Sequence, residues 1–163
     1  MEAILVPQAA PALEARRESE RMRVVIADDH GIVRSGVRML LERQADIEVV
    51  GEASDGAVAR DLVIREKPDL AILDVKMPKL TGLQATREIR EQVPEVAVLI
   101  LSMYDDDRYL FEALKAGASG YVLKSAANRD LIEACRATMR GEPFLYPAAV
   151  RALVRDYLDR ASR

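Results

Sequence analysis

The chain has 163 residues, of which 50% are hydrophobic, and a formal net charge of −3. A chain of this length most simply forms one domain with a short appendage, and its composition allows a sizeable core. The mildly acidic charge argues against a chain that binds nucleic acid or an anionic membrane on its own. The single cysteine, Cys135, excludes an internal disulfide and a cysteine-based zinc site.

The first residues predict no targeting or membrane segment. The start, MEAILVPQAAPALEA, lacks a basic region and is interrupted by Pro7 and Pro11, so it is a poor signal peptide. No apolar run approaches the roughly 20 residues that a membrane span needs. We therefore expect a soluble, cytoplasmic protein without membrane contact, and we interpret residues 1–21 as an N-terminal tail.

From Arg23 onward, short apolar runs alternate with helical patterns. The apolar runs predict five strands, at residues 23–28, 47–50, 69–74, 96–102 and 120–124. Strands without polar alternation are covered on both faces, which is typical of a parallel sheet with helices on each side. Five strand–helix pairs are too few for a closed barrel, so we predict an α/β fold with an open, doubly wound five-stranded parallel sheet.

Local signals mark the ends of the predicted helices. Candidate N-caps are Thr81, Asn128 and either Ser54 or Asp55. The acidic run at residues 105–107 is expected to cap the fourth helix and to meet its positive end. Gly82 and Gly117 are interpreted as turn glycines.

The last segment, residues 141–163, predicts an amphipathic helix outside the five-pair unit. Its apolar residues recur at helical spacing and are Val150, Leu153, Val154, Tyr157 and Leu158. Pro147 stands where such a helix begins. The sequence leaves two interpretations open: the helix packs on its own domain, or it serves as a linker or partner-binding helix.

Polar side chains stand at the carboxyl ends of four predicted strands. They are Asp28 and Asp29 on the first strand, Asp74 on the third, Ser102 on the fourth and Lys124 on the fifth. With a strand order of 2-1-3-4-5, three carboxylates would crowd one pocket at this edge. Like charges raise one another's pKa, and a hard cation such as Mg²⁺ relieves the repulsion. Asp74, central on the sheet, is then the natural nucleophile for a covalent aspartyl phosphate, with Lys124 as a cation and Ser102 as a hydroxyl donor.

The segments VVIADDH, AILDVKMPKLTG, VLILS and AGASGYVLK follow one another in order between residues 24 and 124. In this order and spacing the chain resembles the response-regulator receiver domain of two-component signalling, over residues 22–140. The detail of DDHGIVRSGVRMLL and LSMYDDDRYLFEALKAGASGYVLK is most similar to the NarL/FixJ-type branch, whose members usually carry a C-terminal LuxR-type DNA-binding domain. The resemblance implies a flavodoxin-like (βα)5 sheet with strand order 2-1-3-4-5.

The resemblance also implies roles for single residues. Asp74 would accept a phosphoryl group from the phosphohistidine of a sensor histidine kinase. Mg²⁺ would be held by Asp28, Asp29, Asp74 and the backbone carbonyl of Lys76. Lys124 would pair with the phosphoryl oxygens, the hydroxyl of Ser102 would turn towards them, and the ring of Tyr121 would follow. The phosphorylated domain would then present an altered surface and bind a different partner, often by homodimerisation.

Two departures from the family pattern stand out. Ser125 follows Lys124, where many receivers have a proline after a cis peptide bond, and no DNA-binding domain follows residue 140. We therefore expect either the receiver of a transcriptional regulator whose DNA-binding domain is absent here, or a stand-alone or phosphorylation-independent interaction module. A phosphatase of the haloacid-dehalogenase type is a remote alternative, because it requires an acid at the position of Lys76. We expect no enzymatic activity beyond self-phosphorylation from small phosphodonors and slow self-dephosphorylation. We interpret His30 as a loop residue.

Overall fold

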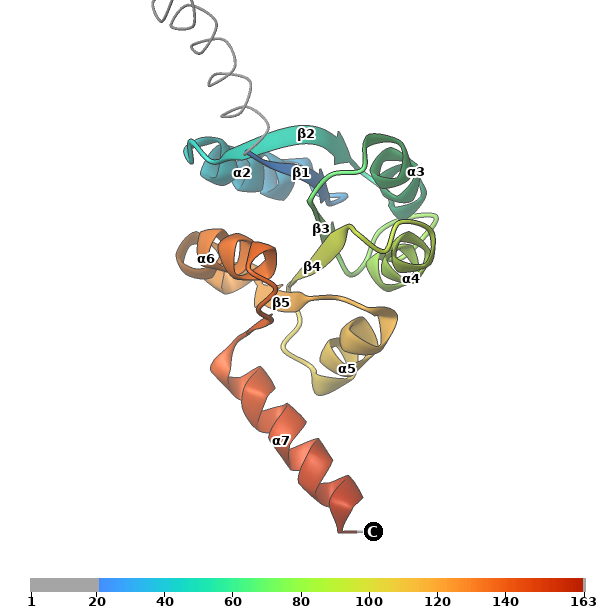
Figure 1. The fold of residues 1–163 in the computed structure, drawn as a ribbon, viewed down its shortest axis with the longest axis vertical. Helices are drawn as coiled ribbons and strands as arrows, with labels where there is room; N and C mark the ends of the chain where they lie inside the picture. The colour runs from blue at the N-terminus through green and yellow to red at the C-terminus, as the bar shows by residue number, and fades with distance from the viewer. Residues whose placement is uncertain (1–20, 163) are drawn as a thin grey trace, which may run out of the picture.

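The computed structural model describes residues 21–162, and these form one parallel sheet between two layers of helices (Figure 1). The strands are β1 (Met22–Ala27), β2 (Ile47–Ala53), β3 (Leu70–Asp74), β4 (Ala97–Ser102), β5 (Gly120–Leu123) and β6 (Phe144–Leu145). The helices are α2 (Gly31–Glu42), α3 (Gly56–Glu66), α4 (Gly82–Gln92), α5 (Asp107–Ala116), α6 (Ala127–Met139) and α7 (Pro147–Ala161). Apart from Arg21, the tail expected at residues 1–21 lies outside the described residues.

The sheet has the order β2-β1-β3-β4-β5-β6. The predicted order of the first five strands is confirmed, and the predicted number of strands is wrong by one. The sixth strand has two residues, which pair in parallel with Gly120 and Tyr121 of β5. So short a strand leaves no alternation or apolar run in the sequence, and tertiary pairing alone creates it.

The buried aliphatic strands divide the core into two layers. Helices α2 and α6 cover one face of the sheet, and α3, α4 and α5 cover the other (Figure 1). β3 is buried along its whole length, because it lies in the middle of the sheet under both layers. This burial explains why its residues are apolar up to Asp74.

Most of the predicted helix ends are confirmed. Asp55 accepts a hydrogen bond from the Val58 amide, and Thr81 forms a capping box with Gln84. Asp106 caps α5. The Asn128 prediction is wrong: a 3-10 turn over Lys124–Ala126 leads directly into α6, so Asn128 lies inside the helix.

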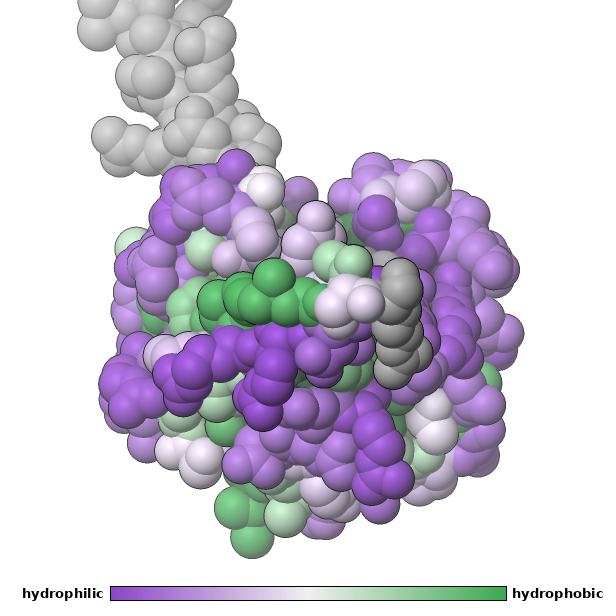
Figure 2. Space-filling view, turned by 90° about the horizontal axis from the view of Figure 1, so that it is seen from below, coloured by the Kyte–Doolittle hydropathy of each residue, from purple (hydrophilic) through white to green (hydrophobic). Residues whose placement is uncertain are grey.

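The C-terminal helix packs on its own domain, which is one of the two interpretations that the sequence left open, while its role as a linker or partner-binding helix stays a prediction. α7 begins at Pro147, and its inner residues Ala149 and Ala152 are buried in the core layer that contains α5. Its outer residues Val150, Val154, Tyr157 and Leu158 are exposed. Seen from this end of the molecule, a hydrophobic band runs beside hydrophilic surface (Figure 2). Among residues 21–162, no helix combines the length and the apolar character that crossing a bilayer demands.

Candidate functional site

The carboxyl edge of the sheet brings Asp28, Asp74 and Lys124 into direct contact. Asp28 follows β1, Asp74 ends the neighbouring β3, and Lys124 follows β5. Lys124 Nζ lies 2.7 Å from Asp28 Oδ2 and 3.2 Å from Asp74 Oδ2. The exposed fractions of Asp28 and Asp74 are only 2% and 5%, so one ammonium group balances two buried carboxylates.

Asp29 completes an acidic cluster with these residues. One ligand atom each of Asp28, Asp29, His30 and Asp74 lies within 4.8 Å of the others. His30 is a loop residue, as expected, and its Nδ1 lies 3.3 Å from Asp28 Oδ1 and 3.1 Å from Asp29 Oδ1. Asp28 Oδ2 is fully buried, and its charged neighbour is the Lys124 ammonium at 2.7 Å. Hard oxygen donors crowded in this way are the ligands that Mg²⁺ prefers.

The surroundings raise the pKa of both Asp74 and Lys124, which disfavours the charged form of the acid and favours the charged form of the base. Burial, and then repulsion from Asp28, raise the pKa of Asp74 above its ordinary value, and Lys124 offsets only part of this. Burial opposes the charge of Lys124, but hydrogen bonding to Asp28 and attraction to Asp74 outweigh it and raise the lysine pKa. At neutral pH the ionised Asp74 therefore costs folding free energy.

This cost gives a pH-dependent prediction for Asp74→Asn in chelator-containing buffer. We expect the variant to be more stable than the unsubstituted chain at pH 7, because it removes a carboxylate that burial and repulsion from Asp28 disfavour. A raised pKa means that the folded state holds the Asp74 proton more tightly, so stability falls as pH rises from the ordinary value of 3.8 towards the folded pKa. The advantage of Asn should therefore vanish below pH 3.8.

Urea unfolding from pH 3 to 8 measures this difference. Asp61→Asn is the matched control, because the Asp61 side chain is 68% exposed on α3. A variant Asp74→Asn that is less stable than the unsubstituted chain at pH 7 would show that the carboxylate is not under electrostatic strain.

Ser102 and Tyr121 both form hydrogen bonds to the backbone of Tyr104, one to its N–H and the other to its carbonyl. Ser102, which is fully buried at the end of β4, accepts a 2.9 Å hydrogen bond from the Tyr104 amide. The phenol of Tyr121 donates a 2.6 Å hydrogen bond to the Tyr104 carbonyl. Burial of the Tyr121 ring raises its pKa to about 12, so the phenol stays protonated and remains a donor.

Lys76 lies in the loop that follows Asp74, with its side chain exposed. Its Nζ lies 4.8 Å from the centroid of the Tyr104 ring, and that ring stacks on Tyr109 with centroids 4.9 Å apart. The contact of these two tyrosines with Lys76 was not predicted, because a contact between two loops and a helix leaves no periodic signal in the sequence. The position of Tyr104, two residues after Ser102, was the available clue.

Gly82 fixes the position of Asp74 through a close backbone approach. A Cβ on Gly82 would lie 1.8 Å from the Asp74 carbonyl oxygen, and the Gly82 amide donates a 2.8 Å hydrogen bond to the Val75 carbonyl. Gly82 is the first residue of α4, so the turn interpretation is wrong for it, whereas Gly117, interpreted as a turn glycine, ends α5 in the left-handed conformation at φ 103°.

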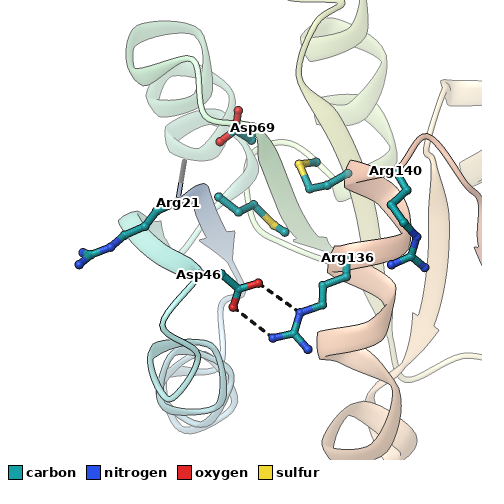
Figure 3. A pocket seen from close by; sticks show the side chains of 7 residues that line it. Arg21, Asp46, Asp69, Arg136 and Arg140 are labelled. Carbon is teal, nitrogen blue, oxygen red and sulfur yellow. Dashed lines mark hydrogen bonds and ion pairs between the residues drawn. The ribbon is translucent and has the colours of Figure 1, made fainter. Parts of the chain in front are cut away.

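A cavity of about 450 Å³ opens at the opposite end of the sheet (Figure 3). Its charged residues Arg21, Asp46, Asp69, Arg136 and Arg140 surround two methionines. Arg136 and Asp46 form a two-bond ion pair across it. Most of its charges are already balanced by protein groups, so this cavity lacks the excess of carboxylates that the acidic cluster has.

Comparison with known proteins now adds to this geometry. The family model "Response regulator receiver domain" matches residues 24–136. The oxygen regulatory protein NreC of Staphylococcus carnosus is 43% identical over 143 residues, which are 87% of this chain and 66% of NreC. NreC of Staphylococcus epidermidis is 44% identical over 141 residues, which are 86% of this chain and 65% of that protein. The chain thus spans slightly less than two thirds of these relatives.

Solved structures agree with the fold. A LuxR-family two-component response regulator from Aurantimonas superposes with a TM-score of 0.79 at 34% identity, covering 85% of this chain and 99% of that one. The receiver domain of the NarL regulator from Mycobacterium tuberculosis gives a TM-score of 0.73 at 36% identity, covering 76% and 99%. With a family match over more than half its length, the chain belongs to the response regulator receiver family, with NreC and NarL/LuxR-type regulators among its homologues.

Proposed function

We propose that this receiver is switched by phosphorylation of Asp74, with a sensor histidine kinase as donor and Mg²⁺ as cofactor. The observation that supports this best is the meeting of Lys124, Asp28 and Asp74, at 2.7 and 3.2 Å from the ammonium nitrogen. A lysine fixed between two buried carboxylates is placed to balance the additional negative charge of a phosphoryl group.

The proposed chemistry is a transfer between two protein side chains. A carboxylate oxygen of Asp74 attacks the phosphorus of a phosphohistidine, an O–P bond forms, and the N–P bond breaks with the electron pair returning to the imidazole. Lys124 remains beside the transferred group as a counter-charge. The hydroxyl of Ser102 donates a hydrogen bond to a phosphoryl oxygen.

The donor set of the site fits Mg²⁺. Asp28, Asp29, Asp74 and the Lys76 carbonyl are proposed to hold it, and the crowding of three carboxylates around one lysine ammonium supports a second cation at the site. When bound, the ion would neutralise charge on the phosphoryl group. The chain's own contribution is to hold these oxygens together in a buried cluster against their mutual repulsion.

The partners are proposed by analogy with the relatives. The regulator RcsB, 32% identical with a TM-score of 0.75 over 82% of this chain, has been solved as two dimers bound to two parallel DNAs. We propose that this chain likewise homodimerises on phosphorylation and acts in transcription regulation. We assign DNA contact to an output domain outside these 163 residues, with residues 141–163 as the linker.

Small phosphodonors test the proposal directly. With Mg²⁺ and acetyl phosphate, intact-mass measurement should show one added phosphoryl group on the unsubstituted chain and none on Asp74→Asn. Asp29→Asn should label about tenfold more slowly or worse, because metal affinity falls. Exposed Asp61→Asn is the control and should label normally. Equal labelling of Asp74→Asn would refute the assignment of the acceptor, and labelling unaffected by a chelator would refute the metal.

A further inference from the structure

We propose that Tyr146 couples the Asp74 site to α7, so that a phosphoryl group at Asp74 loosens the attachment of α7 to the rest of the domain. The inference rests on the proposed function and extends it to a residue and an element beyond the acidic cluster. It is carried by an unbroken series of contacts from Ser102, through Tyr104 and Tyr121, to Tyr146.

The first contacts hold the two peptide groups that flank Tyr104. Its N–H donates to Ser102 Oγ at 2.9 Å, and its carbonyl accepts from the Tyr121 phenol at 2.6 Å. Phosphoryl oxygens at Asp74 require hydrogen-bond donors, and Ser102 ends the neighbouring strand. If the hydroxyl rotates to donate to them, it gives up its present geometry with the Tyr104 amide, and the backbone on the N-terminal side of Tyr104 is released.

The next contacts join the backbone around Tyr104 to the start of α7. The rings of Tyr121 and Tyr146 have centroids 6.0 Å apart and are tilted by 53°, a favourable aromatic arrangement. The Tyr146 hydroxyl also donates to the carbonyl of Asp105, the residue after Tyr104, in a long contact of 3.4 Å. Tyr146 thus contacts both Tyr121 and the loop that Ser102 holds. It is also the N-cap residue of α7, so movement there is transmitted to the helix.

The remaining attachment of α7 is weak enough to be shifted. Its buried residues are the small side chains of Ala149 and Ala152, which bury little apolar area. Val150, Val154 and Tyr157 point outward and are exposed by 47%, 53% and 72%. An element with few buried contacts opens locally at low free-energy cost. The Tyr146 contacts are therefore a substantial part of what holds α7 on the domain.

Hydrogen exchange of the full chain tests this inference, with Mg²⁺ and beryllofluoride as the phosphoryl analogue. In the unsubstituted chain, beryllofluoride should protect the loop after Asp74 and accelerate exchange of the α7 amides about fivefold or more, the usual size of a coupling between sites. In Tyr146→Ala, the α7 amides should exchange fast in both states, while the loop is still protected. Tyr146→Phe retains the ring and should keep most of the response, and Tyr157→Ala, on the outer face, should behave like the unsubstituted chain.

The outcomes separate this inference from the proposed function. Protection of the loop after Asp74 with unchanged or slower exchange in α7 overturns the coupling and leaves the phosphorylation proposal standing. A full α7 response in Tyr146→Ala overturns the role of Tyr146. If beryllofluoride protects nothing near Asp74, the proposed function fails, and the coupling fails with it.

Discussion

Replacing Lys124 with alanine is expected to lower the free energy of unfolding by about 3 kcal/mol, the lower end of the cost of removing one partner from a buried charge pair. The substitution leaves Asp28 and Asp74 facing each other without a counter-charge, and both are at least 95% buried. We choose the lower end because 12% of the lysine side chain is exposed to solvent. Urea unfolding at pH 7 in the presence of a chelator measures the loss.

Lys79→Ala is the matched control for this prediction. The Lys79 side chain is 70% exposed and its Nζ is 3.7 Å from Asp55 Oδ2, so its loss should cost less than about 0.5 kcal/mol. The pKa of Lys124 is raised, so its stabilising effect is complete below its ordinary pKa of 10.5 and is lost as pH rises through the folded pKa. Equal stability losses in the two variants would mean that Lys124 is an ordinary surface lysine.

Gly82→Ala is expected to destabilise the chain by about 2–3 kcal/mol, because the new methyl group has no space. Its Cβ would lie 1.8 Å from the Asp74 carbonyl oxygen, so α4 has to shift away from β3. The same shift displaces the backbone of Asp74, and we expect phosphorylation by acetyl phosphate to fall together with stability.

Gly36→Ala provides a control of opposite sign. Gly36 lies within α2, and a Cβ there meets no atom within 4 Å. Alanine is the better helix former, so this variant should gain about 0.5–1 kcal/mol. Thermal unfolding of both variants, with intact-mass analysis of labelling, gives the comparison. If Gly82→Ala were as stable and as reactive as Gly36→Ala, the close approach to Asp74 would have no consequence.

Aliphatic burial made the fold predictable from the amino-acid sequence. Leu70 to Leu73 form an apolar run because β3 is covered on both faces, and an interruption by Asp74 is informative only in such a run. The same logic placed Asp28 and Lys124 at the carboxyl edge of the sheet, where their side chains do meet. Hydrophobic periodicity and the apolar runs of buried strands are patterns of consecutive residues, so they can be recognised in a single sequence.

Features made by contacts between residues far apart in the fold were not predictable in this way. The stacking of Tyr104 on Tyr109 under Lys76, and the contact of Tyr146 with Tyr121, have no periodic signature. The close approach of Gly82 to Asp74 looks in sequence like any turn glycine. The Asn128 prediction failed because the backbone already turns at Lys124–Ala126, which makes a side-chain cap at Asn128 unnecessary.

The brevity of β6 also matters for how separate molecules meet in solution. A sheet that ends in a long, flat strand offers a row of free N–H and C=O groups on which another chain can polymerise. Here the outermost strand on that side is only Phe144–Leu145, and helix α7 begins at Pro147, two residues after the strand ends. We expect that this edge of the molecule resists strand-by-strand aggregation even at the high concentrations that structural work on the receiver requires.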